Sequence, residues 1–243
     1  MANLQLPGHF YDFKEFQEYA PISPGTHHDF GWLFWAGGLS KYAVAPHLSA
    51  SGVPQLGEYL GGWNDPRLGL MTRSAAAFNC VWSTGSYTEG GDTFGRAIEI
   101  EQAMDLPEIS PGVWAIQKAD PAWALQYDPI HGLGYGPDSE DGLINGCWSF
   151  KSLPMMFRYQ PGQYITLTDN TYHGLIYING VLAHQSRGTA DDWATYNTLN
   201  LDTLGLVPGA ICSLQIFCAV GENPVRFHLE MNIPLEGVYM LAL

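Results

Sequence analysis

The chain has 243 residues, of which 46% are hydrophobic and 14% charged, and its formal net charge is −14. This composition predicts an ordered fold with a sizeable core and excludes a disordered segment. The excess of 24 acidic over 10 basic residues argues against nucleic acid as a partner and against anionic membrane surfaces. No stretch approaches the roughly 18 apolar residues of a spanning helix, so no membrane insertion is expected.

The first 30 residues carry prolines at intervals, in "LPGHFYDF" and "YAPISPG", and predict an extended N-terminal arm. Asp12–Ala20 is compatible with two turns of helix that begin at an aspartate cap. A single domain is expected over residues 31–243, and whether 31–126 form a separate lobe stays open.

The N-terminal sequence has neither the basic start nor the apolar run of a classical signal peptide. There is also no Asn-x-Ser/Thr acceptor for glycosylation. We therefore expect a virion or an extracellular surface structure that assembles without such a signal, or a cytoplasmic location if the protein is cellular.

Residues 31–135 mix short apolar runs with glycine-rich turns such as "YLGGWNDP" and "TEGGDTFG". Within them Arg96–Met104 alternates partly and predicts a strand. Glu99 and Glu101 would share one face of that strand, because residues two apart point to the same side.

The last third of the chain has the clearest pattern of strands. Gln163–Thr168 and Ile211–Val220 alternate, and Phe227–Ile233 alternates more strictly still. The segment Leu175–Leu182 is a predicted hairpin, because its Asn-Gly pair suits the two positive φ angles of a type I′ turn. Short strands separated by turns predict an all-β fold, an antiparallel β-sandwich of jelly-roll-like form.

The apolar C-terminal segment Gly237–Leu243 has two interpretations. It is either a final core strand or a tail that docks on a neighbouring subunit, since an exposed apolar strand invites aggregation. The residues expected at such an oligomer contact are Val238, Tyr239, Met240, Leu241 and Leu243.

Residues typical of catalytic or metal sites are sparse. The four cysteines lack the spacing of zinc ligands and are expected to be buried free thiols. The pair His27 and His28 would point to opposite faces of an extended segment. No phosphate-binding glycine loop, G-x-S-x-G or Cys/His nucleophile pattern occurs, so no catalytic residue is proposed and the protein is not expected to be an enzyme.

Five segments together carry a resemblance to a known family, which is strongest over residues 127–236. The segments are Phe157–Gly162, Leu175–Ala183, Leu199–Gly209, Leu214–Ala219 and Phe227–Leu235. In this order the chain resembles the fibro-slime domain, which is related to the anthrax protective-antigen-like β-sandwich of adhesins and carbohydrate-binding modules. The resemblance implies one β-sandwich domain over most of the chain.

The chain departs from this family at the calcium site. The family places three acidic residues directly before the hairpin, where this sequence has Thr171, Tyr172 and His173. Asp169 and Asn170 lie just upstream and are only weak candidates for a metal ligand. The resemblance therefore implies a degenerate calcium site, and no cofactor is expected.

A ligand site is predicted from the loops around the hairpin. Asp191, Asp192 and Trp193 combine acids with an aromatic ring and form either a sugar or cation site or a plain polar loop. The complete candidate set is Asp169, Asn170, Tyr172, His173, Asn179, His184, Asp191, Asp192 and Trp193.

These observations predict a non-catalytic, surface-displayed structural or recognition protein. The favoured role is a component of a virion, a phage-like particle or an extracellular coat, with partners that include other proteins and the chain itself. The alternative is a calcium-independent adhesin module that binds a cell-surface glycan.

Overall fold

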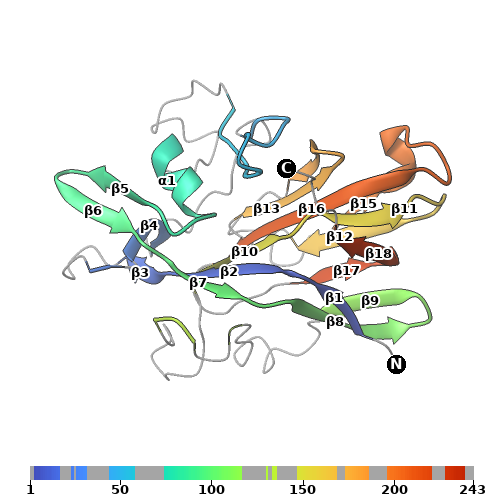
Figure 1. Cartoon of the computed structure of the whole chain (residues 1–243), viewed down its shortest axis with the longest axis horizontal. Coiled ribbons are helices and arrows are strands. Elements are labelled where there is room, and N and C mark those ends of the chain that lie inside the picture. The colour runs from blue at the N-terminus through green and yellow to red at the C-terminus, as the bar shows by residue number, and fades with distance from the viewer. Residues whose placement is uncertain are drawn as a thin grey trace.

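The computed structural model describes residues 3–16, 23–24, 26–31, 44–57, 74–116, 130, 133–135, 147–168, 173–185, 196–220 and 228–238. Over these residues two large antiparallel sheets pack face to face (Figure 1). The predicted all-β antiparallel sandwich is confirmed.

One sheet has six strands and the other has eight. In spatial order the six-stranded sheet consists of β1 (Asn3–Leu6), β8 (Met104–Ser110), β9 (Val113–Ile116), β17 (Leu229–Met231), β12 (Tyr164–Thr168) and β15 (Tyr196–Asn200). The main path of the eight-stranded sheet consists of β14 (Val181–Gln185), β13 (His173–Ile178), β16 (Ile211–Val220), β10 (Trp148–Ser152), β2 (Gly8–Asp12) and β7 (Ile98–Glu101).

Strand β16 organises the eight-stranded sheet because its ten residues pair with several neighbours. Along one edge it pairs with β13, and along the other with β10 at its C-terminal end and β11 (Met155–Arg158) at its N-terminal end. β18 (Leu235–Val238) pairs in turn with β11. Of the predicted C-terminal segment Gly237–Leu243, only Gly237 and Val238 belong to β18, and the other predicted contact residues lie outside the described part of the chain.

Smaller elements flank the two sheets. β3 (Lys14–Phe16) pairs in parallel with β4 (Thr26–Gly31), and β5 (Ser86–Glu89) forms a hairpin with β6 (Asp92–Gly95). A short helix, α1 (Ala75–Cys80), begins at Ser74, whose Oγ accepts from the N–H of Ala77 at 3.1 Å. The 3-10 helix η2 covers Leu201–Leu204.

The N-terminal segment is extended, as predicted, but it is part of both sheets. β1 pairs with β8 in the six-stranded sheet, whereas β2 lies between β10 and β7 in the other. Leu6 and Phe10 are consequently buried in the central core. The suggestion of a helix over Asp12–Ala20 is wrong at its start, because Lys14–Phe16 is a strand; residues 17–20 lie outside the described part.

Around β13 and β16 the eight-stranded sheet packs against protein on both faces. Its inner face packs on the six-stranded sheet through the even-numbered residues 212–218 of β16, as the alternation predicted. Its outer face is covered by α1 and the segment 44–57, which pack against Tyr177, Phe217 and Ala219 (Figure 1). The hairpin strand therefore has apolar residues on both sides, because both sides are in contact with protein.

Local features of the chain agree with the predicted chemistry. Asn179 and Gly180 have φ angles of 53° and 73°, as a type I′ turn requires. All four cysteines are buried and free. Among the described residues, no helix has the length and apolar character to cross a bilayer.

The two-sided burial of β16 gives a stability prediction. The ring of Phe217 is fully buried and lies 5.5 Å from the Trp82 ring and 5.7 Å from the Tyr177 ring. Phe217→Ala should lower the free energy of unfolding by about 3–5 kcal/mol through the cavity it leaves. Val207, which is 68% exposed, provides the control, and Val207→Ala should cost less than about 0.5 kcal/mol. Urea unfolding of both variants measures this, and equal losses would contradict a packed outer layer.

Candidate functional site

The structure describes three members of the predicted ligand set, and for one of them, His173, it describes only the backbone. His173, Asn179 and His184 lie on or beside the β13–β14 hairpin. The members that lie outside the described residues are Asp169, Asn170, Tyr172, Asp191, Asp192 and Trp193.

The described members do not come together in one site. His173 begins β13 and Asn179 follows its last residue, so about 20 Å of strand separates them at roughly 3.3 Å per residue. The side-chain oxygen of Asn179 accepts from the N–H of Ser213 at 2.9 Å, and its own N–H donates to the Ser213 carbonyl at 3.0 Å. Asn179 thus fastens the hairpin turn to β16.

His184 lies opposite Ile176 in the middle of the hairpin. Burial lowers the pKa of its imidazole, and its Nε2 has no hydrogen-bond partner in the described part of the chain. The described residues also contain no group of three or more His, Cys, Asp or Glu side chains that could hold a metal ion. His184 is therefore an isolated neutral imidazole within the described structure.

The motifs that carry the family resemblance meet in a network of structural hydrogen bonds. The hydroxyl of Tyr159 donates to Asp202 Oδ1 at 2.7 Å, and the N–H of Gly162 donates to the same atom at 2.9 Å. The Tyr159 hydrogen bond, followed by that from Gly162, lowers the pKa of the Asp202 carboxyl. This aspartate of "LDTLGLVPG" therefore joins η2 to the turn between β11 and β12.

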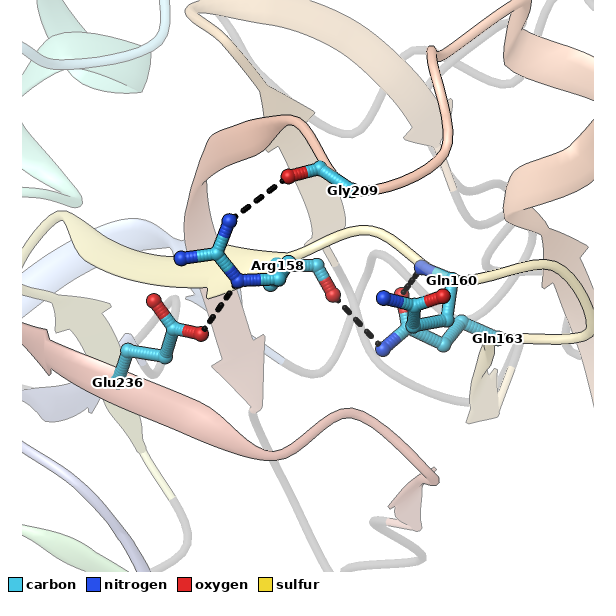
Figure 2. A network of polar contacts seen from close by, with 5 residues as sticks. All are labelled: Arg158, Gln160, Gln163, Gly209 and Glu236. Carbon is cyan, nitrogen blue, oxygen red and sulfur yellow. Dashed lines mark hydrogen bonds and ion pairs between the residues drawn. The ribbon is translucent and has the colours of Figure 1, made fainter.

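Figure 2 shows the neighbouring part of this network, centred on Arg158. Its Nη1 donates to the Gly209 carbonyl at 2.8 Å, and its Nε lies 3.2 Å from Glu236 Oε1 of β18. Gln163 donates to the Arg158 carbonyl at 3.2 Å and accepts from the N–H of Gln160 at 2.9 Å. The polar residues of these motifs bind one another, and they stabilise the fold.

A polar pocket, called here the outer pocket, lies on the outer face of the eight-stranded sheet. Its volume is about 530 Å³. It lies among β2, β7 and β10, the segment 44–57, and the C-terminal end of α1. The residues that line it are Tyr11, Ser49, Ser51, Val53, Gln55, Asn79, Trp82, Ser83, Thr84, Glu99 and Lys151.

The sheet supplies the charged groups of the outer pocket. Glu99 of β7 pairs with Tyr11 of β2, whose hydroxyl donates to Glu99 Oε1 at 3.1 Å. His9 Nδ1 also lies 3.1 Å from that oxygen. Burial raises the pKa of the Tyr11 phenol, and the charge of Glu99 raises it further, so Tyr11 is a neutral donor. One carboxylate oxygen of Glu99 thus accepts a hydrogen bond from Tyr11, and His9 Nδ1 lies near it without forming a hydrogen bond.

Lys151 of β10 lies on the same face, across β2 from Glu99. Burial lowers the pKa of its ammonium group, and the charge of Glu99 raises that pKa to a smaller extent. Lys151 has no hydrogen-bond or ion-pair partner among the residues that the structure describes. The pocket therefore has a half-buried cation that is open to a ligand.

The other walls contribute neutral polar groups on well-fixed backbones. Ser49 Oγ accepts from the N–H of Val53 at 3.1 Å and lies 2.8 Å from Ser51 Oγ, which closes the loop. Below α1, Trp82 is buried and packs edge-on against Phe217. The amides of Gln55 and Asn79 are exposed and form no side-chain hydrogen bond within the described structure.

Sequence reasoning found only one component of this pocket, the carboxylate Glu99. The pocket joins strands whose pairing no local pattern shows, since β2, β7 and β10 are separated by long stretches of chain. In β2 the polar residues His9 and Tyr11 lie on either side of the buried Phe10. Because neighbouring residues of a strand point to opposite faces, this alternation could have indicated a polar outer face.

Comparison with known proteins gives no match to the chain from family models, curated proteins or solved structures.

The Asp202 network gives a pH-dependent prediction. Because folding lowers the pKa of Asp202, its contribution to stability is present above the unfolded-state pKa of about 3.9 and is lost as the pH falls through the folded-state pKa. Asp202→Asn should therefore lower the urea midpoint at pH 6, and its difference from the wild type should shrink at pH 3.

The exposed Asp105 of β8 provides the control for this measurement. Asp105→Asn should leave the urea midpoint close to that of the wild type at pH 6. A difference for Asp202→Asn that is as large at pH 3 as at pH 6 would contradict a role for the ionised carboxylate.

Proposed function

We propose that this protein is a non-catalytic recognition module that binds a small hydroxyl-rich ligand, such as a sugar residue of a glycan, in the outer pocket. The observation that carries the proposal is the concentration of unpaired polar side chains around one cavity on a rigid sheet. The amides of Gln55 and Asn79 and the hydroxyl of Thr84 form no side-chain hydrogen bond within the described part of the chain, and the side chain of Lys151 lines the same cavity.

The dimensions of the outer pocket support a ligand of this kind. Its volume of about 530 Å³ lies within the range of roughly 300–1,000 Å³ that is common for small-molecule sites. Amide groups both donate and accept hydrogen bonds, as sugar hydroxyls do. Tyr11 and Trp82 are buried, so the ligand would meet polar groups more than an exposed aromatic platform.

The arrangement of carboxylates supports binding over catalysis. Glycoside hydrolysis typically requires two carboxyl groups on either side of the scissile bond. Glu99 is the one carboxylate among the described residues that line the pocket, and its Oε1 is already bonded by Tyr11. Glu101 pairs with His9 instead and does not line the cavity.

The resemblance to the fibro-slime domain supports the same proposal, since that family is related to adhesins and carbohydrate-binding modules. In this chain the family motifs form the structural network around Asp202. The ligand site proposed here lies on the other side of the eight-stranded sheet from the central core, and it uses no calcium.

A second candidate function is a structural component of a virion, a phage-like particle or an extracellular coat. The observation that favours it is β18, which pairs on one side only within the described structure and leads directly to the apolar residues 239–243. A strand edge of this kind can accept a strand from another chain. The two functions are compatible, because a coat protein can display a binding pocket.

The recognition proposal predicts the effect of two pocket substitutions. The wild-type protein should bind members of a glycan array without added calcium. Gln55→Ala and Asn79→Ala should each weaken binding of the best glycan by about 1 kcal/mol, or roughly fivefold in Kd, through loss of one hydrogen bond. The exposed Gln5 of β1 is remote from the pocket, so Gln5→Ala is the matched control. Unchanged affinity in both pocket variants would refute this site.

The assembly proposal predicts how the native protein sediments. Isolated from its source without detergent, it should pellet with a large particle at a fixed stoichiometry, which mass spectrometry of the pellet measures. A soluble monomer at high concentration would refute the assembly role and leave the recognition role in place.

A further inference from the structure

The outer pocket contains one feature that a neutral sugar does not explain, which is the ammonium group of Lys151. Its side chain is half-buried, and burial lowers its pKa. A cation that is removed from water without a partner is unfavourable, and a bound anion would offset that cost. The position of Lys151 in the cavity therefore indicates an anionic group on the ligand.

Neighbouring groups do not neutralise Lys151. Lys151 pairs with His9 across the sheet, whereas Glu99 pairs with Tyr11, so the two charges lie on opposite sides of β2. Two strand spacings of about 4.8 Å and an offset of two residues along the strand place their backbones roughly 12 Å apart. Glu99 Oε1 moreover accepts a hydrogen bond from the Tyr11 hydroxyl. Glu99 favours the charged form of Lys151 through its field alone.

The other walls of the pocket add no charge. The segment 44–57 contributes Ser49, Ser51, Val53 and Gln55, and the end of α1 contributes neutral polar residues and Trp82. Among the described residues, the pocket thus has one cation and one anion at separate positions. A ligand that suits both has one anionic group at one end and hydroxyl donors at the other.

The overall charge restricts the anionic group further. The chain has a net charge of −14, and Glu99 is inside the pocket, so a dianion such as a phosphate ester would be repelled. A carboxylate carries a single charge and suits one ammonium group. A sugar ring with a hydrogen bond at each end spans a distance of the same order as that between Lys151 and Glu99.

We propose that the outer pocket selects a uronate-type sugar, in which Lys151 binds the ring carboxylate and Glu99 accepts hydrogen bonds from ring hydroxyls. This inference rests on the recognition function proposed above. In this proposal Lys151 distinguishes acidic from neutral sugars. The amides of Gln55 and Asn79 bind hydroxyl groups that both kinds of sugar have.

The test compares two ligands that differ only at one carbon. Methyl β-D-glucuronide carries a carboxylate where methyl β-D-glucoside carries a hydroxymethyl group, and the galacto-configured pair covers the other common stereochemistry. Calorimetric titration of the full chain should show that one acidic sugar binds at least about tenfold more tightly than its neutral counterpart, because hydrogen bonds to charged groups are the stronger ones.

Lys151→Met should remove this preference, so that the acidic and the neutral sugar bind with affinities within about twofold of each other. The substitution retains most of the length of the side chain, and it removes a desolvated charge, so thermal unfolding should occur at the same temperature or slightly higher. Lys14→Met makes the same change in net charge outside the pocket, where Lys14 donates to Ser23 at 3.2 Å, and it should leave the preference intact.

The possible failures are distinguishable. Equal binding of acidic and neutral sugars by the wild type would overturn the uronate inference and leave the recognition function standing. A preference that survives Lys151→Met would overturn the role of Lys151. No binding of any of the four sugars, together with no binding on the glycan array, would overturn both the inference and the function on which it rests.

Discussion

The burial of β16 on both faces is the constraint on which the rest of the structure depends. A strand with Ile216 facing the central core and Phe217 facing the other way requires protein on both sides. The six-stranded sheet covers one side, and α1 with the segment 44–57 covers the other. A plain two-layer sandwich would leave Tyr177, Phe217 and Ala219 in contact with water, at a cost of about 1.5–3 kcal/mol for each large apolar side chain.

The outer layer also explains where a binding pocket can form. Around Tyr177, Phe217 and Ala219 the outer face is apolar and buried. Toward β10, β2 and β7 the same face carries Lys151, Tyr11 and Glu99, which line the cavity. The change from apolar to polar residues across one sheet face thus places the outer pocket beside the well-packed part of the sheet. A site held by strands in this way keeps its geometry better than one formed by loops alone.

The motifs that carry the family resemblance have a different role from the one that a ligand-binding interpretation gives them. Tyr159, Gly162 and Asp202 bond to one another, and Arg158 joins Gly209 to Glu236. These bonds hold η2 against the turn between β11 and β12, and they join β11 to β18. Residues that bond to one another in this way stabilise the fold and do not identify a ligand, because a fold hosts many functions.

The sequence by itself determined the local elements of this protein. Alternation set the strands around Leu167, Ile216 and Met231, and Asn179-Gly180 set the hairpin turn, because both signals depend on residues that are close along the chain. Only the tertiary structure decided which strands are neighbours. It inserted β2 between β10 and β7, and it brought Lys151 and Glu99 to one cavity. Strand pairing over such sequence distances depends on the packing of whole faces, and no local pattern of residues records it.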